Sequence, residues 1–351
     1  MNNIKKILVI VQRSNGDVFF ALSLIYYLRM NLPGSQIHIL INDDTAGVLK
    51  LRKDFDKAFL FSYKEKYKKG FKYIFSIIKN IYKNYDLSIN LTSSDRSVLF
   101  SILASKISIS MIEKNKLKSW WKKIFLSKYY YYEPKEHNLI QILQPLNLLK
   151  MKYSLVLKEP KFSGKDIASM RKKLNDLGIG KFLIFHPSAQ YEYKVYPELL
   201  RIKLLSLLTE LNTDIIVTGG KTKIDQDINL GIPKNKKIHN FIGQTSLLEY
   251  SILCKLSEAY IGMDTLNMHI AASQNKKIFL ISGPTNMQKW SPWSNEINEK
   301  NNFLHEIFQA NMECVPCGKM GCNDNGESRC LKEISPSMIT RSVSNFLNSN
   351  N

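Results

Sequence analysis

Apolar positions along the chain gather in short continuous runs, and a polar turn and a helix-like pattern follow the strongest of them. The run "KKILVIV" (5–11) leads through "QRSNGD" into the helical pattern "VFFALSLIYYLRMN" (18–31). The same order returns at "KFLIFHPS" (181–188), followed by "ELLRIKLLSLLTELN" (198–212). Such runs are typical of strands buried on both faces of a parallel sheet. Two separate starts predict an α/β protein with two doubly wound, Rossmann-like domains.

The stretch "YSLVLKEPKFSGKD" loses helical periodicity and contains Pro160 and Gly164, which favours a domain boundary there. The tail "SPSMITRSVSNFLNSN" predicts a final helix capped at Ser335 or Ser337. The predicted divisions are residues 1–160, 161–334 and 335–351.

Polar residues follow the predicted strands, in the turns 13–17, 186–194, 218–225 and 264–269. Ligands of open parallel sheets bind at the carboxyl ends of strands, so these turns are the candidate site. They contain no Gly-x-Gly-x-x-Gly fingerprint and no Walker A lysine loop, which argues against a dehydrogenase and an ATPase. Two domains with such turns suit an enzyme that uses a nucleotide sugar.

The composition indicates a globular protein but does not indicate which reaction it catalyses. Of the 351 residues 44% are hydrophobic and 23% charged, as in globular proteins. No apolar run approaches the roughly 20 residues of a membrane helix. The apolar run at 7–11 is too short for a signal peptide. A cytoplasmic protein is therefore expected.

The formal charge of +20 comes from lysines that are densest at "YKEKYKKGFKY" and "MIEKNKLKSWWKK". Such a surface favours nucleic acid, anionic lipid or a phosphorylated glycolipid. Solvated lysine-rich faces are the alternative. Trp120 and Trp121 among lysines suit a membrane interface. Recognition motifs for nucleic acid do not appear, so no nucleic-acid partner is expected.

Six short motifs in register give the sequence a family resemblance. They are "ILVIVQRSNGD" (7–17), "KVYP" (194–197), Gly219–Gly220, "GQTSLLEY" (243–250), "DTLNMH" (264–269) and "GPT" (283–285). Together the chain resembles, from about Ile7 to Leu331, the ADP-heptose lipopolysaccharide heptosyltransferases. These are inverting glycosyltransferases of family 9 with the GT-B fold.

The resemblance implies two Rossmann-like domains facing across a cleft. It implies ADP-heptose as donor and a lipopolysaccharide core or lipid A acceptor at the inner-membrane surface, where the enzyme would be peripheral. It also implies that no cofactor is required for catalysis. The strings "KWSPWS" (289–294) and "CVPCGKMGCNDNGESRCL" (314–331) look like the branch that contains lipopolysaccharide core heptosyltransferase III.

On the acceptor side, the resemblance makes Asp17 the general base. A sugar hydroxyl is a poor nucleophile, and a single inverting displacement needs a base beside it. The alternative is an aspartate that caps the following helix or complements its dipole. Gly16 would allow the substrate close to the backbone, and Arg13 and Ser14 belong to the same turn.

On the donor side, the resemblance pairs Lys194 with the diphosphate, which offsets charge on the leaving group. Ser188 either donates to that phosphate or caps its own turn. Asp264 would contact hydroxyls of the donor sugar, and Asp225 is the nearest carboxylate for the ribose. The helix entry at Thr265, Leu266, Asn267 and Met268 would aim backbone N–H groups at the diphosphate. His269 is expected to pack and orient the loop.

The chain departs from its relatives at Leu266–Asn267, where most have Gly-Pro. Leucine adds bulk near the phosphates and lacks glycine's freedom. The departure leaves open another sugar, for a capsule or surface glycan. Relatives often have a glutamate shortly after the Gly-Gly turn, where this chain reads "GGKTKIDQD", so UDP or GDP in place of ADP also stays open. A catalytically idle relative is a further alternative.

Four of the five cysteines lie close together, at Cys314, Cys317, Cys322 and Cys330. The spacing fits a structural tetrahedral zinc, and four reduced thiols are the alternative. Cys254 falls in an apolar helical pattern and is expected in the core.

Overall fold

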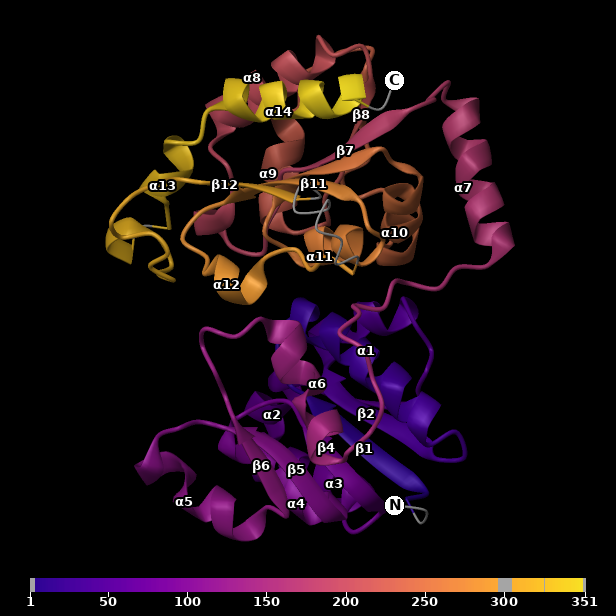
Figure 1. Ribbon diagram of the computed structural model, residues 1–351, viewed down its shortest axis with the longest axis vertical. Helices are drawn as coiled ribbons and strands as arrows, with labels where there is room; N and C mark the ends of the chain where they lie inside the picture. Colours follow the sequence, from indigo (N-terminus) through magenta and orange to yellow (C-terminus); the bar gives the residue numbers. More distant parts are fainter. Residues whose placement is uncertain (1–3, 296–304, 325, 350–351) are drawn as a thin grey trace. The chain divides into compact units, whose positions relative to one another are not determined.

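The computed structural model describes residues 4–295, 305–324 and 326–349. The chain forms two compact units, residues 1–158 and 159–351 (Figure 1). Each unit holds one six-stranded sheet in which all paired strands are parallel. This confirms the predicted fold class of two doubly wound α/β halves.

Unit 1 carries its strands in the order β3-β2-β1-β4-β5-β6. Its elements are β1 (Lys6–Val11), α1 (Asn15–Asn31), β2 (Gln36–Asn42), η1 (Asp43–Lys50), β3 (Lys57–Phe61), α2 (Tyr63–Lys69), α3 (Phe71–Ile81), β4 (Tyr85–Asn90), α4 (Asp95–Ala104), β5 (Ser105–Ile112), α5 (Lys116–Phe125), β6 (Lys128–Tyr131) and α6 (Asn138–Leu148).

The strand order reverses at β1, and this reversal puts helices on both faces of the sheet. The connections after β1 run toward β3, and those after β3 run toward β6, so right-handed crossovers place them on opposite faces. Helix α1 packs with α6 and η1, whereas α3 packs with α4. Residues 7–11 of β1 are fully buried between these layers. The opening apolar run therefore forms the centre of the first core.

Unit 2 has the order β12-β11-β10-β7-β8-β9. Its elements are α7 (Gly164–Asp176), β7 (Phe182–His186), η2 (Glu192–Lys194), α8 (Glu198–Thr209), β8 (Asp214–Val217), α9 (Lys223–Leu230), β9 (Ile238–Asn240), α10 (Leu247–Leu256), β10 (Ala259–Met263), α11 (Leu266–Ser273), β11 (Lys277–Ser282), α12 (Met287–Trp290), β12 (His305–Gln309), η3 (Cys322–Asp324), α13 (Arg329–Lys332) and α14 (Pro336–Ser349).

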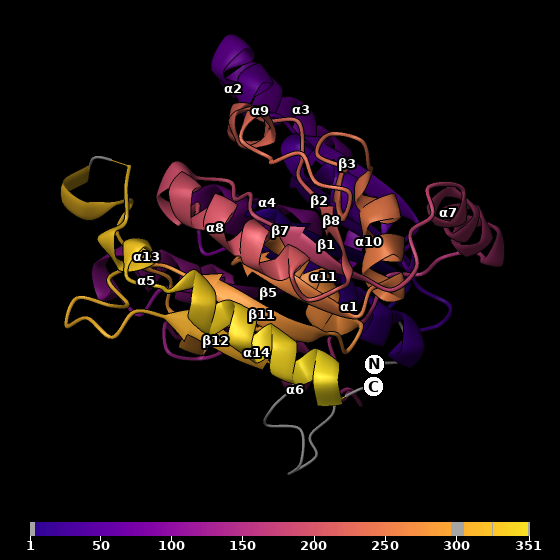
Figure 2. The same cartoon turned by 90° about the horizontal axis from the view of Figure 1, so that it is seen from above.

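The last helix, α14, belongs to the core of unit 2. It packs on α8 and β11 and buries Ile339 and Val343 completely (Figure 2). Its start at Pro336 agrees with the predicted cap region. Cys254 in α10 is also fully buried, as expected of a core residue.

Strand β10 approaches β7 unusually closely at Gly262. Its φ is +156°, and a Cβ there would lie 2.3 Å from the carbonyl oxygen of His186. Only glycine fits this contact, which sits one residue before the end of β10. The close approach fixes how the carboxyl ends of β7 and β10 lie side by side.

In the part of the chain that the structure describes, no helix combines the length and the apolar character needed to cross a membrane.

Candidate active site

The turn after β1 places Asp17 inside the first turn of α1, where its side chain is almost fully buried. Ser14 occupies the N-cap, so Asp17 is not the cap, although a carboxylate there complements the helix dipole. Oδ1 of Asp17 lies 3.1 Å from Nε of Arg13 and accepts from Nδ2 of Asn138 at 3.1 Å. Oδ2 accepts from Oγ of Ser14 at 2.7 Å. A carboxylate has about four acceptor positions, so Oδ2 keeps one for a further donor.

Asn138 contacts Asp17 of this turn and was not predicted from the sequence. It is the first residue of α6 and lies 2% exposed. The N-cap before it, His137, accepts from the N–H of Leu139 through Nδ1 at 3.2 Å, and its ring meets Phe20 edge-on. These contacts hold the start of α6 against α1. The one available signal was an asparagine at the start of an apolar helical pattern.

Tyr130 lies near the same turn and has a buried hydroxyl without a hydrogen-bond partner among the described residues. Burial raises the pKa of Tyr130, and the nearby Arg13 guanidinium opposes that rise. Burial also raises the pKa of Glu136, and the charge of this carboxylate adds to the rise in the pKa of Tyr130. A neutral phenol from β6 thus lies near the Arg13 cation and a half-buried carboxyl group.

Lys194 and Asp264 form the centre of the second cluster. Nζ of Lys194, at the end of η2, lies 2.8 Å from Oδ2 of Asp264, which directly follows β10. The lysine side chain is 24% exposed and the aspartate side chain 8%. The structure therefore brings together two of the predicted donor residues that stand 70 positions apart in the chain.

The helix that follows, α11, begins at Leu266 with Thr265 as its N-cap. No side-chain hydrogen bond caps this end among the residues described, whereas Ser246 closes a capping box on α10. The backbone N–H groups of this first turn therefore remain free of a side-chain cap. Met268 is fully buried, so its side chain does not reach solvent at this helix end.

Two further residues of this region hold the strand ends. His269 is buried, and its ring lies 6.0 Å from that of Trp290, as a packing histidine would. Nδ2 of Asn267 lies 3.3 Å from Nδ1 of His186, and the Asn267 carbonyl accepts from Tyr250 Oη at 3.0 Å.

His186 ends β7 and joins these contacts, although it was not among the predicted site residues. Its Nδ1 also meets Oγ1 of Thr218 at 2.9 Å. Burial lowers the pKa of His186 to about 4, with Asp225 opposing the change, so its ring is neutral at pH 7. Two donors at Nδ1 would leave the ring proton on Nε2.

Asp225 lies in the first turn of α9, and its carboxylate is fully engaged. It accepts from Oγ of Ser188 at 2.5 Å, the N–H of Gly220 at 2.8 Å, and both the N–H and Oγ1 of Thr222 at 2.8 and 2.5 Å. Burial alone would raise the pKa of Asp225, but these hydrogen bonds outweigh it and lower the pKa. Four bonds use the acceptor capacity of the group.

The engagement of Asp225 bears on two predicted roles. Binding a ribose would require one of its four bonds to be exchanged, and Ser188 gives its proton to Asp225 rather than to a phosphate. A Cβ on Gly220 would lie 2.9 Å from Oδ2 of Asp225, so the Gly-Gly turn makes room for the carboxylate. The arrangement fixes the turn after β8, and both donor roles stay predictions.

The cysteine loop contacts the turn before Lys194, where Oγ of Ser328 donates to the carbonyl of Tyr193 at 2.6 Å. Cys314 and Cys317 are exposed, Cys322 is intermediate, and Cys330 is buried, which raises the pKa of its thiol. Within the described residues, no group of three or more His, Cys, Asp or Glu side chains is arranged to hold a metal. Zinc at this loop stays a prediction.

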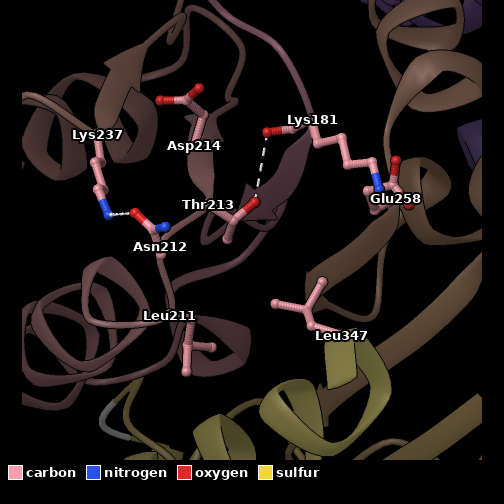
Figure 3. Close-up of a pocket in the computed structure, with 8 residues that line it drawn as sticks. All are labelled: Lys181, Leu211, Asn212, Thr213, Asp214, Lys237, Glu258 and Leu347. Carbon is pink, nitrogen blue, oxygen red and sulfur yellow. Dashed lines mark hydrogen bonds between the residues drawn. The ribbon is translucent and has the colours of Figure 1, made fainter. Parts of the chain in front are cut away.

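A cavity in unit 2 lies near the amino ends of β7 and β8 (Figure 3). The candidate site turns lie at the opposite, carboxyl ends of the strands. Its lining includes Lys181, Asn212 and Lys237, and Nζ of Lys237 donates to Asn212 Oδ1 at 2.7 Å. None of the predicted site residues lines it.

Two parallel doubly wound sheets with polar turns at the carboxyl ends of their strands are the architecture of the GT-B fold. A solved glycosyltransferase of family 9 from Veillonella parvula has a TM-score of 0.79 at 16% identity and covers 98% of both chains. The solved ADP-heptose lipopolysaccharide heptosyltransferase II of Escherichia coli has a TM-score of 0.73 at 16% identity, covering 98% of this chain and 99% of its own.

Sequence comparison gives the family. The model of glycosyltransferase family 9 (heptosyltransferase) matches residues 74–324, well over half of the chain. The chain is 26% identical over 295 residues to lipopolysaccharide heptosyltransferase 3 of Escherichia coli, covering 81% of this chain and 85% of that protein. The protein belongs to glycosyltransferase family 9, the heptosyltransferases, and is a glycosyltransferase.

Proposed function

We propose that the protein transfers heptose from ADP-L-glycero-D-manno-heptose to the inner core of lipopolysaccharide, with inversion, as a heptosyltransferase of type III. The similarity to heptosyltransferase 3 along most of the chain supports the acceptor class. The ADP-heptose enzyme of the same fold supports the donor. Because the proposed acceptor is linked to a lipid, we propose that the protein acts as a peripheral enzyme on the cytoplasmic side of the inner membrane.

The observation that carries the chemistry is the carboxylate of Asp17 with one oxygen position left open. In the proposed reaction, that position on Oδ2 takes the proton of the attacking sugar hydroxyl. Arg13 and Asn138 hold Oδ1, so the carboxylate does not need to reorganise during the transfer. Gly16 leaves the backbone beside it uncovered by a side chain, and the hydroxyl of Tyr130 is an unused donor in the same region.

On the donor side, the proposal assigns the diphosphate to Lys194 and to the N–H groups at the start of α11. The lysine and these N–H groups stabilise the charge that grows on the leaving ADP, so we propose that no metal is required. Asp264 orients Lys194 and contacts the donor sugar. Ser188, Asp225 and His269 hold the surrounding turns.

The function is tested first with the purified full chain. ADP-heptose is offered with lipopolysaccharide core that lacks the side-branch heptose, next to UDP- and GDP-sugars, and nucleotide release is followed together with product mass. We expect release from ADP-heptose alone and a gain of one heptose in the product. Turnover of another nucleotide sugar without ADP-heptose turnover would refute the donor.

The second test uses cells. Mass analysis of the lipid core from cells with and without the gene should differ by one heptose, and a copy with Asp17→Ala should behave like the deletion. If that copy restores the core, Asp17 is not the base.

A second candidate is a family 9 transferase that uses another nucleotide sugar for a capsule or surface glycan. Leu266 and Asn267 favour it, because they replace the Gly-Pro of most relatives at the start of α11. The nucleotide-sugar panel above separates the two candidates.

A further inference from the structure

Helix α5 displays an apolar stripe to solvent. Leu117 is 87% exposed, Trp120 60%, Ile124 66% and Phe125 62%. Spacings of three and four residues put Leu117, Trp120 and Ile124 on one side of the helix, and Phe125 is its last residue. Exposed apolar residues that lie singly are ordinary on a protein surface, but four on one ten-residue helix are not.

This stripe is held on a well-anchored helix. The opposite side of α5 buries Ser119 and Lys122, and Trp121 packs with Val98 of α4 and Ile112. Nζ of Lys122 bonds the Ser93 carbonyl and Asp95, both at 2.7 Å, and its side chain is only 3% exposed. The exposed stripe is therefore a fixed part of unit 1.

A second stripe crosses from α2 to α3. Tyr67 is 82% exposed, Phe71 89% and Phe75 69%, each four residues from the next. Helix α3 buries Ile77 and Ile81 against the sheet, so the rings of Phe71 and Phe75 are on its outer side. Helix α3 packs with α4, which in turn packs with α5, and the three share one face of the first sheet (Figure 1).

Lysines surround both stripes. Lys64, Lys68, Lys69 and Lys72 are sequence neighbours of the exposed aromatic residues of α2 and α3, and Nζ of Lys66 lies 5.8 Å from the centroid of the Tyr67 ring. Lys118 and Lys123 belong to α5, and Lys114 precedes it. Glu65 and Glu133 pair with Lys69 and Lys114, at 2.7 and 2.6 Å. Apolar side chains within a positive rim match an anionic bilayer, where lysine stems lie along the apolar region and their ammonium groups reach the headgroups.

We propose that α2, α3 and α5 form a docking surface for a bilayer containing anionic phospholipid, with the two stripes at the acyl boundary. The inference rests on the proposed function in one respect: a lipid-linked acceptor gives docking a purpose. A second copy of the chain would be expected to meet a less charged surface, because interface centres are depleted of lysine.

The test is flotation of the full chain with phosphatidylcholine vesicles, with and without phosphatidylglycerol. We expect binding that needs the anionic lipid and weakens with salt. The double variants Trp120→Ser with Ile124→Ser, and Phe71→Ser with Phe75→Ser, should each weaken it by about tenfold or more. The pair Lys68→Glu with Lys72→Glu should do the same without touching an apolar contact. The matched control is Leu199→Ser with Leu230→Ser in unit 2, where both leucines are over 80% exposed.

Unchanged binding in all the stripe variants would overturn the proposal. A dimer of the chain that dissociates in the same variants would also overturn it. So would duplex DNA that displaces the protein from vesicles and whose binding is weakened by the same variants. Transfer to a delipidated, water-soluble core oligosaccharide separates this proposal from the proposed function. That activity should stay within about twofold in the stripe variants if their effect is on membrane docking alone.

Discussion

The turns at Asp17 and Asp264 are built alike and differ in how firmly they are held. Each follows a strand of the sheet in its own unit and leads into a helix, and each carboxylate is buried beside a cation. Asp17 accepts hydrogen bonds from Ser14 and Asn138 and forms an ion pair with Arg13 of its own turn. Asp264 pairs with Lys194, which comes from a distant loop and is a quarter exposed.

The difference suggests a division of labour between the two turns. A base must be fixed before the acceptor arrives, which suits the three contacts of Asp17. A phosphate-binding lysine must exchange its partner when the donor enters, which suits a single ion pair near solvent. We therefore expect substitutions at the two turns to affect different kinetic constants.

The largest effect is expected for Asp17→Asn. Loss of the proton acceptor should lower kcat by about 10³-fold, because a positioned general base contributes about 10²–10⁴-fold. The KM for the nucleotide sugar should hardly change. Steady-state rates of ADP release measure this, with the exposed Asp176→Asn as control. A variant that keeps more than a tenth of the wild-type kcat would move the base elsewhere.

Lys194→Ala should follow with a loss of about 10²-fold in kcat/KM for the donor, since it removes charge stabilisation of the leaving group. It also leaves Asp264 buried without its cation. Adding Asp264→Asn should recover thermal stability but not activity. Lys203→Ala, on the exposed side of α8, is the control. If Lys194→Ala and Lys203→Ala lose the same factor in kcat/KM, only the net charge of the protein matters.

Asn138→Ala should lower kcat by roughly tenfold, the value of one lost hydrogen bond to a charged group. Both KM values should stay within about twofold, because the residue positions Asp17 and is not proposed to touch substrate. Asn138→Ser, which keeps a donor, should recover part of the rate. The exposed Asn147→Ala on the same helix should be silent. A change in KM alone would instead make Asn138 a binding residue.

The smallest effect concerns stability and pH. Burial holds the pKa of His186 near 4 in the folded chain, against 6.5 ordinarily, so the unfolded chain takes up the proton first as pH falls. The free energy of unfolding should therefore be full above about pH 6.5 and fall toward pH 4, by at most about 1.4 kcal/mol per pH unit. His186→Gln should flatten this slope in denaturant titrations. An unchanged slope would assign the loss to other groups.

Much of this fold could be predicted because buried parallel strands appear in the sequence as short continuous apolar runs. Asp17, Lys194 and Asp264 could be proposed as site residues because their turns follow such runs and match family motifs. The start of α1 was placed at Val18, since the apolar pattern begins there, but the helix begins at Asn15. Its polar first turn has no apolar signature.

The missed contacts are those that depend on distant segments meeting. Asn138 reaches Asp17 across 121 positions, and His186 meets Thr218 across 32. No periodicity encodes such pairs. The four bonds to Asp225 likewise require the Gly-Gly turn to fold against α9, which spacing alone does not reveal.

Gly262 has a consequence for how the sequence can vary. A library of all substitutions at this position should yield no folded protein except the parent, because even one added methyl group collides with the backbone of β7. Libraries at Gly34, Gly47 and Gly180 should accept most residues, since nothing lies within 4 Å of an added Cβ there. Evolutionary drift in this chain should be blocked near the carboxyl end of β10 and free at those three exposed positions.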